Sequence, residues 1–61
     1  MITEEEAVRA AREDWPEAEG FEKVQGGWTF RIGGGYCSVT DAGTVAPYPQ
    51  GTRSDAHRWM M

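Results

Sequence analysis

The sequence predicts an α+β fold in which an N-terminal helix packs on a three- to four-stranded antiparallel meander, with or without a short C-terminal helix. Apolar residues near the N-terminus recur at helical spacing, whereas later ones alternate with polar residues as in strands. Short glycine-rich segments separate the alternating runs, and consecutive strands joined by such turns pair with each other. The length of 61 residues suits a single domain, which we expect to span residues 1–61.

The N-terminal segment carries a clear helix-start signal. Thr3 is a good N-cap residue, and Glu6, at the third helical position, completes a capping box. Small apolar residues and Trp15 then share one helical face. Pro16 disfavours helical dihedral angles at the residue before it. These signals together predict a helix over residues 4–14.

Strands are expected wherever alternation or strand-forming residues dominate, namely over residues 21–25, 28–32, 36–40 and 44–46. The turns between them are expected at glycines, namely at Gly26-Gly27, Gly33-Gly34-Gly35 and Asp41-Ala42-Gly43. Pro47 and Pro49 should end the fourth strand, because proline cannot donate a hydrogen bond to a neighbouring strand.

Alternation also predicts which side chains form the core. Trp28, Phe30 and Ile32 should face the helix, and Cys37 should share a sheet face with Val39. One helix covers a single face of such a sheet, so the opposite face is expected to be open.

The C-terminal segment is the remaining source of apolar surface. Ser54 is expected to cap a short helix over residues 55–60, and a helix of this length is marginal unless it docks on another element. Trp59, Met60 and Met61 are bulky, and such residues are costly in water. We expect them either to dock on the open sheet face or to contact a partner or a second copy.

Charge and hydropathy argue against several classes of function. With ten acidic and six basic residues, the net charge of −4 opposes nucleic-acid and membrane-surface binding, which both require a basic surface. The longest apolar run is too short to cross a bilayer, and the acidic N-terminus lacks the hydrophobic region of a signal peptide. A single cysteine suits a reducing compartment. We therefore expect a cytoplasmic protein without a nucleic-acid or membrane partner.

Few residues offer catalytic or metal-binding chemistry. Cys37 is the only cysteine and His57 the only histidine, so neither an intrachain disulfide nor a structural zinc site is expected. Nothing near Cys37 in the sequence supplies the base that a nucleophilic thiol needs. Gly33-Gly34-Gly35 leads into a strand, whereas a phosphate-binding loop leads into a helix. We expect no catalytic residue, metal or cofactor, with Cys37 as a core residue and His57 structural or solvated.

The order of motifs resembles a known family. Its three parts are Glu4-Glu5-Glu6-Ala7-Val8 at the helix start, Gly27-Trp28-Thr29-Phe30 before a glycine-rich turn, and Ser38-Val39-Thr40-Asp41-Ala42-Gly43-Thr44-Val45. In this order most of the chain is similar to small α+β immunity proteins of bacterial polymorphic toxin systems. Peptidase-inhibitor-like modules and small phage proteins show the same order. The chain departs from the pattern in its shorter length, its tight glycine turn and one missing residue in the Asp41-Ala42-Gly43 turn. The resemblance implies binding and neutralisation of a toxin protein, and it transfers no active-site residue.

The leading hypothesis is a non-enzymatic protein-interaction module, of the immunity type or a phage-encoded inhibitor. Its partner is expected on the open sheet face or its edge, with the acidic helix as electrostatic steering. The candidate contact residues are Arg31, Tyr36, Tyr48, Trp59 and Met60. One alternative is a homo-oligomeric accessory protein that dimerises through Trp59, Met60 and the sheet edge. A second alternative is a small ligand-binding protein or enzyme that uses Cys37 and His57.

Overall fold

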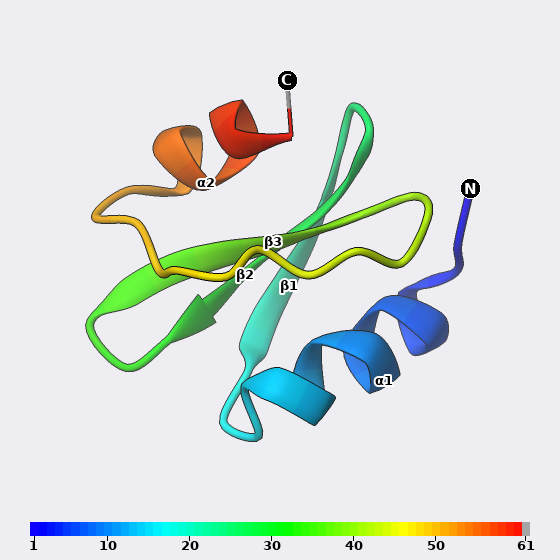
Figure 1. Cartoon of the computed structure of the whole chain (residues 1–61), viewed down its shortest axis with the longest axis horizontal. Helices are drawn as coiled ribbons and strands as arrows, with labels where there is room; N and C mark the ends of the chain where they lie inside the picture. The colour runs from blue at the N-terminus through cyan, green and yellow to red at the C-terminus, as the bar shows by residue number, and fades with distance from the viewer. Residues whose placement is uncertain (61) are drawn as a thin grey trace.

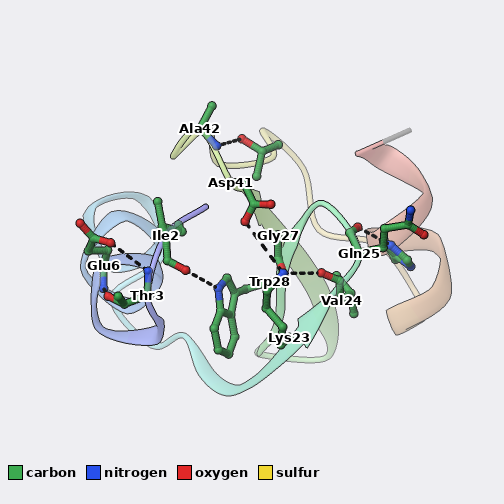
Figure 2. Close-up of polar contacts among 12 residues, drawn as sticks. Ile2, Thr3, Glu6, Lys23, Val24, Gln25, Gly27, Trp28, Asp41 and Ala42 are labelled. Carbon is green, nitrogen blue, oxygen red and sulfur yellow. Dashed lines mark hydrogen bonds and ion pairs between the residues drawn. The ribbon is translucent and has the colours of Figure 1, made fainter.

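Helix α1 spans Glu4–Asp14, the bounds that the sequence predicts. Thr3 Oγ1 accepts a hydrogen bond from the Glu6 amide at 3.2 Å, and the Thr3 amide donates one to the Glu6 carboxylate at 2.8 Å (Figure 2). The bond from the Thr3 amide holds the pKa of the Glu6 carboxyl below its ordinary value, because it favours the charged form. Trp15 is the C-cap residue, and Pro16 prevents the helix from continuing.

The computed structural model describes residues 1–60, and its strands form one antiparallel sheet in the order β1-β2-β3 (Figure 1). Strand β1 spans Glu19–Val24, β2 spans Gly27–Ile32 and β3 spans Gly35–Thr40. A second helix, α2, spans Arg53–Trp59. This order of elements confirms the predicted α+β class.

The first hairpin differs from the prediction in its register. Val24 pairs with Gly27, so the turn consists of Gln25 and Gly26 and not of Gly26 and Gly27. Gly26 has a φ of +94°, a conformation that other residues rarely adopt. At its other end, β1 begins at Glu19 and contains a bulge, so the strand starts before the predicted residue 21.

One face of the sheet forms the core with α1. The buried apolar residues of this cluster are Ala7, Ala11, Ala18, Phe30, Ile32, Cys37, Val39 and Ala46. Trp28 packs against them, and its Nε1–H donates to the Ile2 carbonyl oxygen at 3.3 Å (Figure 2). The Phe21 ring stacks on Phe30 with 5.0 Å between the ring centroids. The predicted inward-facing residues of β2 and the shared face in β3 are both confirmed.

The predicted fourth strand, residues 44–46, is not a regular strand. Within residues 1–60 the chain after β3 makes only isolated bridges to that strand, at Val45 and Gln50. Residues 44–50, which we call the edge segment, nevertheless follow the outer edge of β3 (Figure 1). Pro47 and Pro49 lie between the two bridges and lack the N–H groups that a continuous ladder requires.

The sheet face opposite α1 is covered by the C-terminal segment, which is one of the two outcomes expected for it, so this face is not open to a partner. Helix α2 packs there on β2 and β3, and the sheet lies between the two helices (Figure 1). Thr52, and not Ser54, is the N-cap residue, since Thr52 Oγ1 accepts a hydrogen bond from the Asp55 amide at 3.1 Å. The side chains at this contact are small, and Gly27, Thr29, Ser38 and Ala56 are all buried.

Two side chains of α2 attach it to the sheet. Arg53 Nη1 donates to Thr29 Oγ1 at 2.8 Å, and the guanidinium lies 5.0 Å from the centroid of the Tyr36 ring. His57 Nε2 lies 2.8 Å from the carbonyl oxygen of Gln25 in the β1–β2 turn. These contacts give the only histidine of the chain a structural role.

Candidate interaction surface

The residues predicted to bind a partner lie in separate parts of the structure. Arg31 and Tyr36 are cross-strand neighbours near the β2–β3 turn. The Arg31 side chain is 52% exposed, and its Nη2 lies 3.6 Å from a carboxylate oxygen of Glu19. The Tyr36 ring lies against the Arg53 guanidinium within its own domain. Of these two residues, Arg31 is the more accessible to a partner.

Trp59 and Met60 lie at the other end of the sheet, beside the β1–β2 turn. Met60 Sδ is so close to Gly27 that an added Cβ there would meet it at 3.0 Å. Gly27 and Arg31 are four positions apart along β2, a distance of about 13 Å, so Trp59 and Met60 are not direct neighbours of Arg31 and Tyr36. Met61, the end of the predicted tail, lies outside the described residues.

Among the aromatic residues predicted to contact a partner, Tyr48 is the most exposed to solvent. It is 71% exposed, against 37% for Trp59. Pro47 and Pro49 flank it and restrict the backbone on both sides. Its carbonyl oxygen lies 3.7 Å from Cys37 Sγ. The backbone of Tyr48 is therefore held in place while its ring projects into solvent.

A shallow depression of about 440 Å³ lies between the end of α1 and the edge segment. One of its lining residues, Pro49, follows Tyr48 in the sequence. Its lining consists of Trp15, Glu17, Ile32, Gly33, Gly34, Gly35, Pro49 and Gln50. Sequence reasoning missed this feature, because its walls come from three parts of the chain. The Trp15-Pro16-Glu17 sequence is the signal that could have indicated it, since Pro16 leaves an aromatic residue at a helix end.

A larger depression, of about 710 Å³, runs along the outer face of α1. Its lining residues all belong to that helix, and they are Glu4, Glu5, Val8, Arg9, Arg12 and Glu13. One helix supplies a single wall and cannot enclose a ligand. This surface corresponds to the predicted acidic face and is not a binding cleft.

Most basic side chains are already engaged within the domain. Four of them lie within 4.0 Å of a carboxylate, namely Lys23 with Asp41, Arg31 with Glu19, Arg53 with Glu22 and Arg58 with Asp55. Arg12 donates instead to the Ala18 carbonyl oxygen. Among residues 1–60, Asp14 and Glu17 form no ion pair. The end of α1 therefore carries a negative potential, to which the helix dipole adds.

Cys37 and His57 lie on opposite faces of the sheet. Cys37 belongs to the core beneath α1, whereas His57 bonds from α2 to the β1–β2 turn. Burial raises the pKa of the Cys37 thiol, and the charge of Asp14 adds to the rise, whereas hydrogen bonds from the Ser38 amide and the Trp15 indole oppose it. The Cys37 Sγ–H donates to the Ala46 carbonyl oxygen at 3.4 Å. The geometry therefore does not assemble the pair that a Cys37/His57 site would need.

Cys37 is expected to resist thiol reagents in the folded protein. Its complete burial and raised pKa keep both access and the thiolate fraction low. At about pH 8 we expect a disulfide reagent to react at least ~100-fold more slowly than with the protein in guanidinium chloride. Equal rates under the two conditions would show that the thiol is open to solvent in the native state.

Comparisons with known proteins add no functional assignment. No protein-family model matches the chain, and no curated protein or solved structure matches it. Among residues 1–60, no group of three or more His, Cys, Asp and Glu side chains is placed to hold a metal ion. No helix in that range has the length and apolar character needed to cross a membrane. The function has to be inferred from the surface itself.

Proposed function

We propose that the chain is a small protein-interaction module that acts by binding another protein and not by catalysis. Tyr48 carries the proposal, because its ring is 71% exposed on a backbone restricted by Pro47 and Pro49. An aromatic side chain on a fixed backbone supplies a large contact area while losing little conformational entropy on binding. Buried tyrosines are also frequent among the residues that dominate interface energies.

The surroundings of Tyr48 support the same proposal. Pro49, the residue after Tyr48 in the sequence, lines the depression that also contains Trp15. A projecting aromatic residue is therefore followed directly by a residue of a concave surface. Protein interfaces commonly combine such an anchor with a pocket. The carboxylates of Asp14 and Glu17 add a negative field that would speed encounter with a basic partner.

Within this proposal, the specific form that we favour is an immunity-type protein or a phage-encoded inhibitor. Its support is the order of motifs in the sequence, in which a capped helix precedes an aromatic strand and a strand that ends in an Asp41-Ala42-Gly43 turn. In that form the partner would be a toxin or another effector protein, which the module would occlude by binding. The α1 carboxylates would then steer the complex.

Affinity capture with the intact chain tests the proposal. A partner retained from host extract at micromolar concentration should also be retained by Thr44→Ala, an exposed change in the same segment. It should be released by Tyr48→Ala, with an affinity loss of about 30-fold, as for a typical interface anchor. Two results would contradict the proposal, namely no specifically retained protein or equal retention by Tyr48→Ala.

A homo-oligomeric accessory role is the second candidate. It is favoured by the position of β1, which is an edge strand of the sheet, and by Trp59, which remains 37% exposed. Light scattering over a range of concentrations distinguishes the two roles. A dimer that Trp59→Ser dissociates would support this second role, whereas a strict monomer at high concentration would exclude it.

A further inference from the structure

The depression between the end of α1 and the edge segment combines an aromatic wall with a carboxylate. Trp15 is partly buried, and its Nε1 is fully enclosed on the side of the Cys37 thiol. The polar edge of the indole therefore points into the protein, and the carbon atoms of the ring line the depression. Pro49 and the glycines at 33–35 add further apolar wall, and Glu17 stands exposed at the margin.

The net charge around this depression is negative. Glu17 lines it, and Asp14 precedes Trp15 directly in the chain. The C-terminal end of α1 adds a partial negative charge at the same place. No basic side chain belongs to the lining. Arg12, the basic residue of the last turn of α1, donates to the Ala18 carbonyl oxygen and keeps its positive charge, which offsets one of the two carboxylates.

We propose that this depression binds the arginine side chain of a basic partner protein. The inference rests on the proposed function, and it names the part of the partner that this surface recognises. A guanidinium is planar, so it stacks on an indole and on a proline ring while donating hydrogen bonds to a carboxylate. Trp15, Pro49 and Glu17 supply these three partners.

Other occupants fit the surface less well. An apolar side chain would gain contact with Trp15 and Pro49 but would leave the Glu17 carboxylate partly desolvated without a partner. An anionic group would be repelled by Glu17 and Asp14. A lysine would satisfy the charge but would lose the planar stacking.

A nuclear magnetic resonance titration of the intact chain with acetyl-glycyl-arginyl-glycine amide tests this proposal. The backbone amide signals of Gly33, Gly34 and Gly35 and the indole signal of Trp15 should shift together and saturate at millimolar peptide. The same peptide with citrulline in place of arginine keeps the shape and loses the charge. We expect the affinity of the citrulline peptide to be at least about fivefold lower than that of the arginine peptide.

Two surface variants with the same change in net charge complete the test. Glu17→Gln should weaken binding of the arginine peptide about threefold to tenfold, whereas Glu5→Gln, on the outer face of α1, should leave it unchanged. Absence of the shifts, equal binding of the citrulline peptide or an unchanged Glu17→Gln would each overturn the proposal. Capture of a partner through Tyr48 is measured separately, so failure of the arginine site can be distinguished from failure of the module.

Discussion

Gly27→Ala is expected to lower the free energy of unfolding by about 3 kcal/mol or more, which is most of the stability of the domain. A Cβ at this position would overlap the Val39 carbonyl oxygen and would lie 2.9 Å from Thr40 Cα. Both are backbone atoms of β3 and cannot move aside without breaking the sheet, and Met60 Sδ closes the remaining space. Overpacking of a fitted core costs about 1–3 kcal/mol or more. A single core of this size supplies only about 3–5 kcal/mol of stability.

Circular dichroism during thermal unfolding measures this effect. Gly34→Ala is the matched control, because a Cβ there meets no atom within 4 Å. The control should unfold within a few degrees of the native chain, since about 1 kcal/mol shifts the midpoint of a domain this small by roughly 4–8 °C. A folded Gly27→Ala with a native midpoint would mean that α2 and β3 do not approach β2 as closely as described.

Arg53→Ala is expected to lower the free energy of unfolding by about 2–3 kcal/mol. The substitution removes the bonds from Arg53 to Thr29 Oγ1 and to the Gly20 carbonyl oxygen, which join α2 to two strands. Thr29 is fully buried, so its hydroxyl would be left without this partner. The contact between the guanidinium and the Tyr36 ring would also be lost.

Urea unfolding compares this variant with Arg31→Ala, which removes another arginine from the same sheet face. Arg31 is paired with Glu19, and both side chains are more than half exposed, so the loss should stay below about 1 kcal/mol. Hydrogen exchange at the amides of α2 provides a local measurement and should quicken in Arg53→Ala. Equal stability of the two variants would show that Arg53 does not anchor the helix.

The parts of the fold that were predicted correctly depend on short-range interactions. The capping box of Thr3 and Glu6 and the stop at Pro16 act within a few residues, so α1 could be placed before any tertiary contact was known. Likewise, alternation in β2 identified its inward face, because side-chain direction in a strand follows from residue parity.

The features that the sequence did not predict correctly are those that tertiary contacts determine. Docking of the C-terminal segment on the second face is one of two outcomes that its bulky residues predict, but the contacts that hold α2 there come from Ala56 and from the polar side chain of Arg53. Two adjacent glycines predict a turn that includes Gly27, whereas Gly27 belongs to β2 and pairs with Val24. The depression at Trp15 could not be foreseen, because its opposite wall is formed by the edge segment.

The first two residues of β2 join distant parts of the chain. The Trp28 indole binds the Ile2 carbonyl oxygen on one face of the sheet, and Gly27 receives Met60 on the other. Neither helix is therefore a separable unit, since the segments that contain both helices contact the same two residues of β2, Gly27 and Trp28. Unfolding should be all-or-none, and a nascent chain cannot complete the packing on both faces of its sheet until residue 60 has left the ribosome.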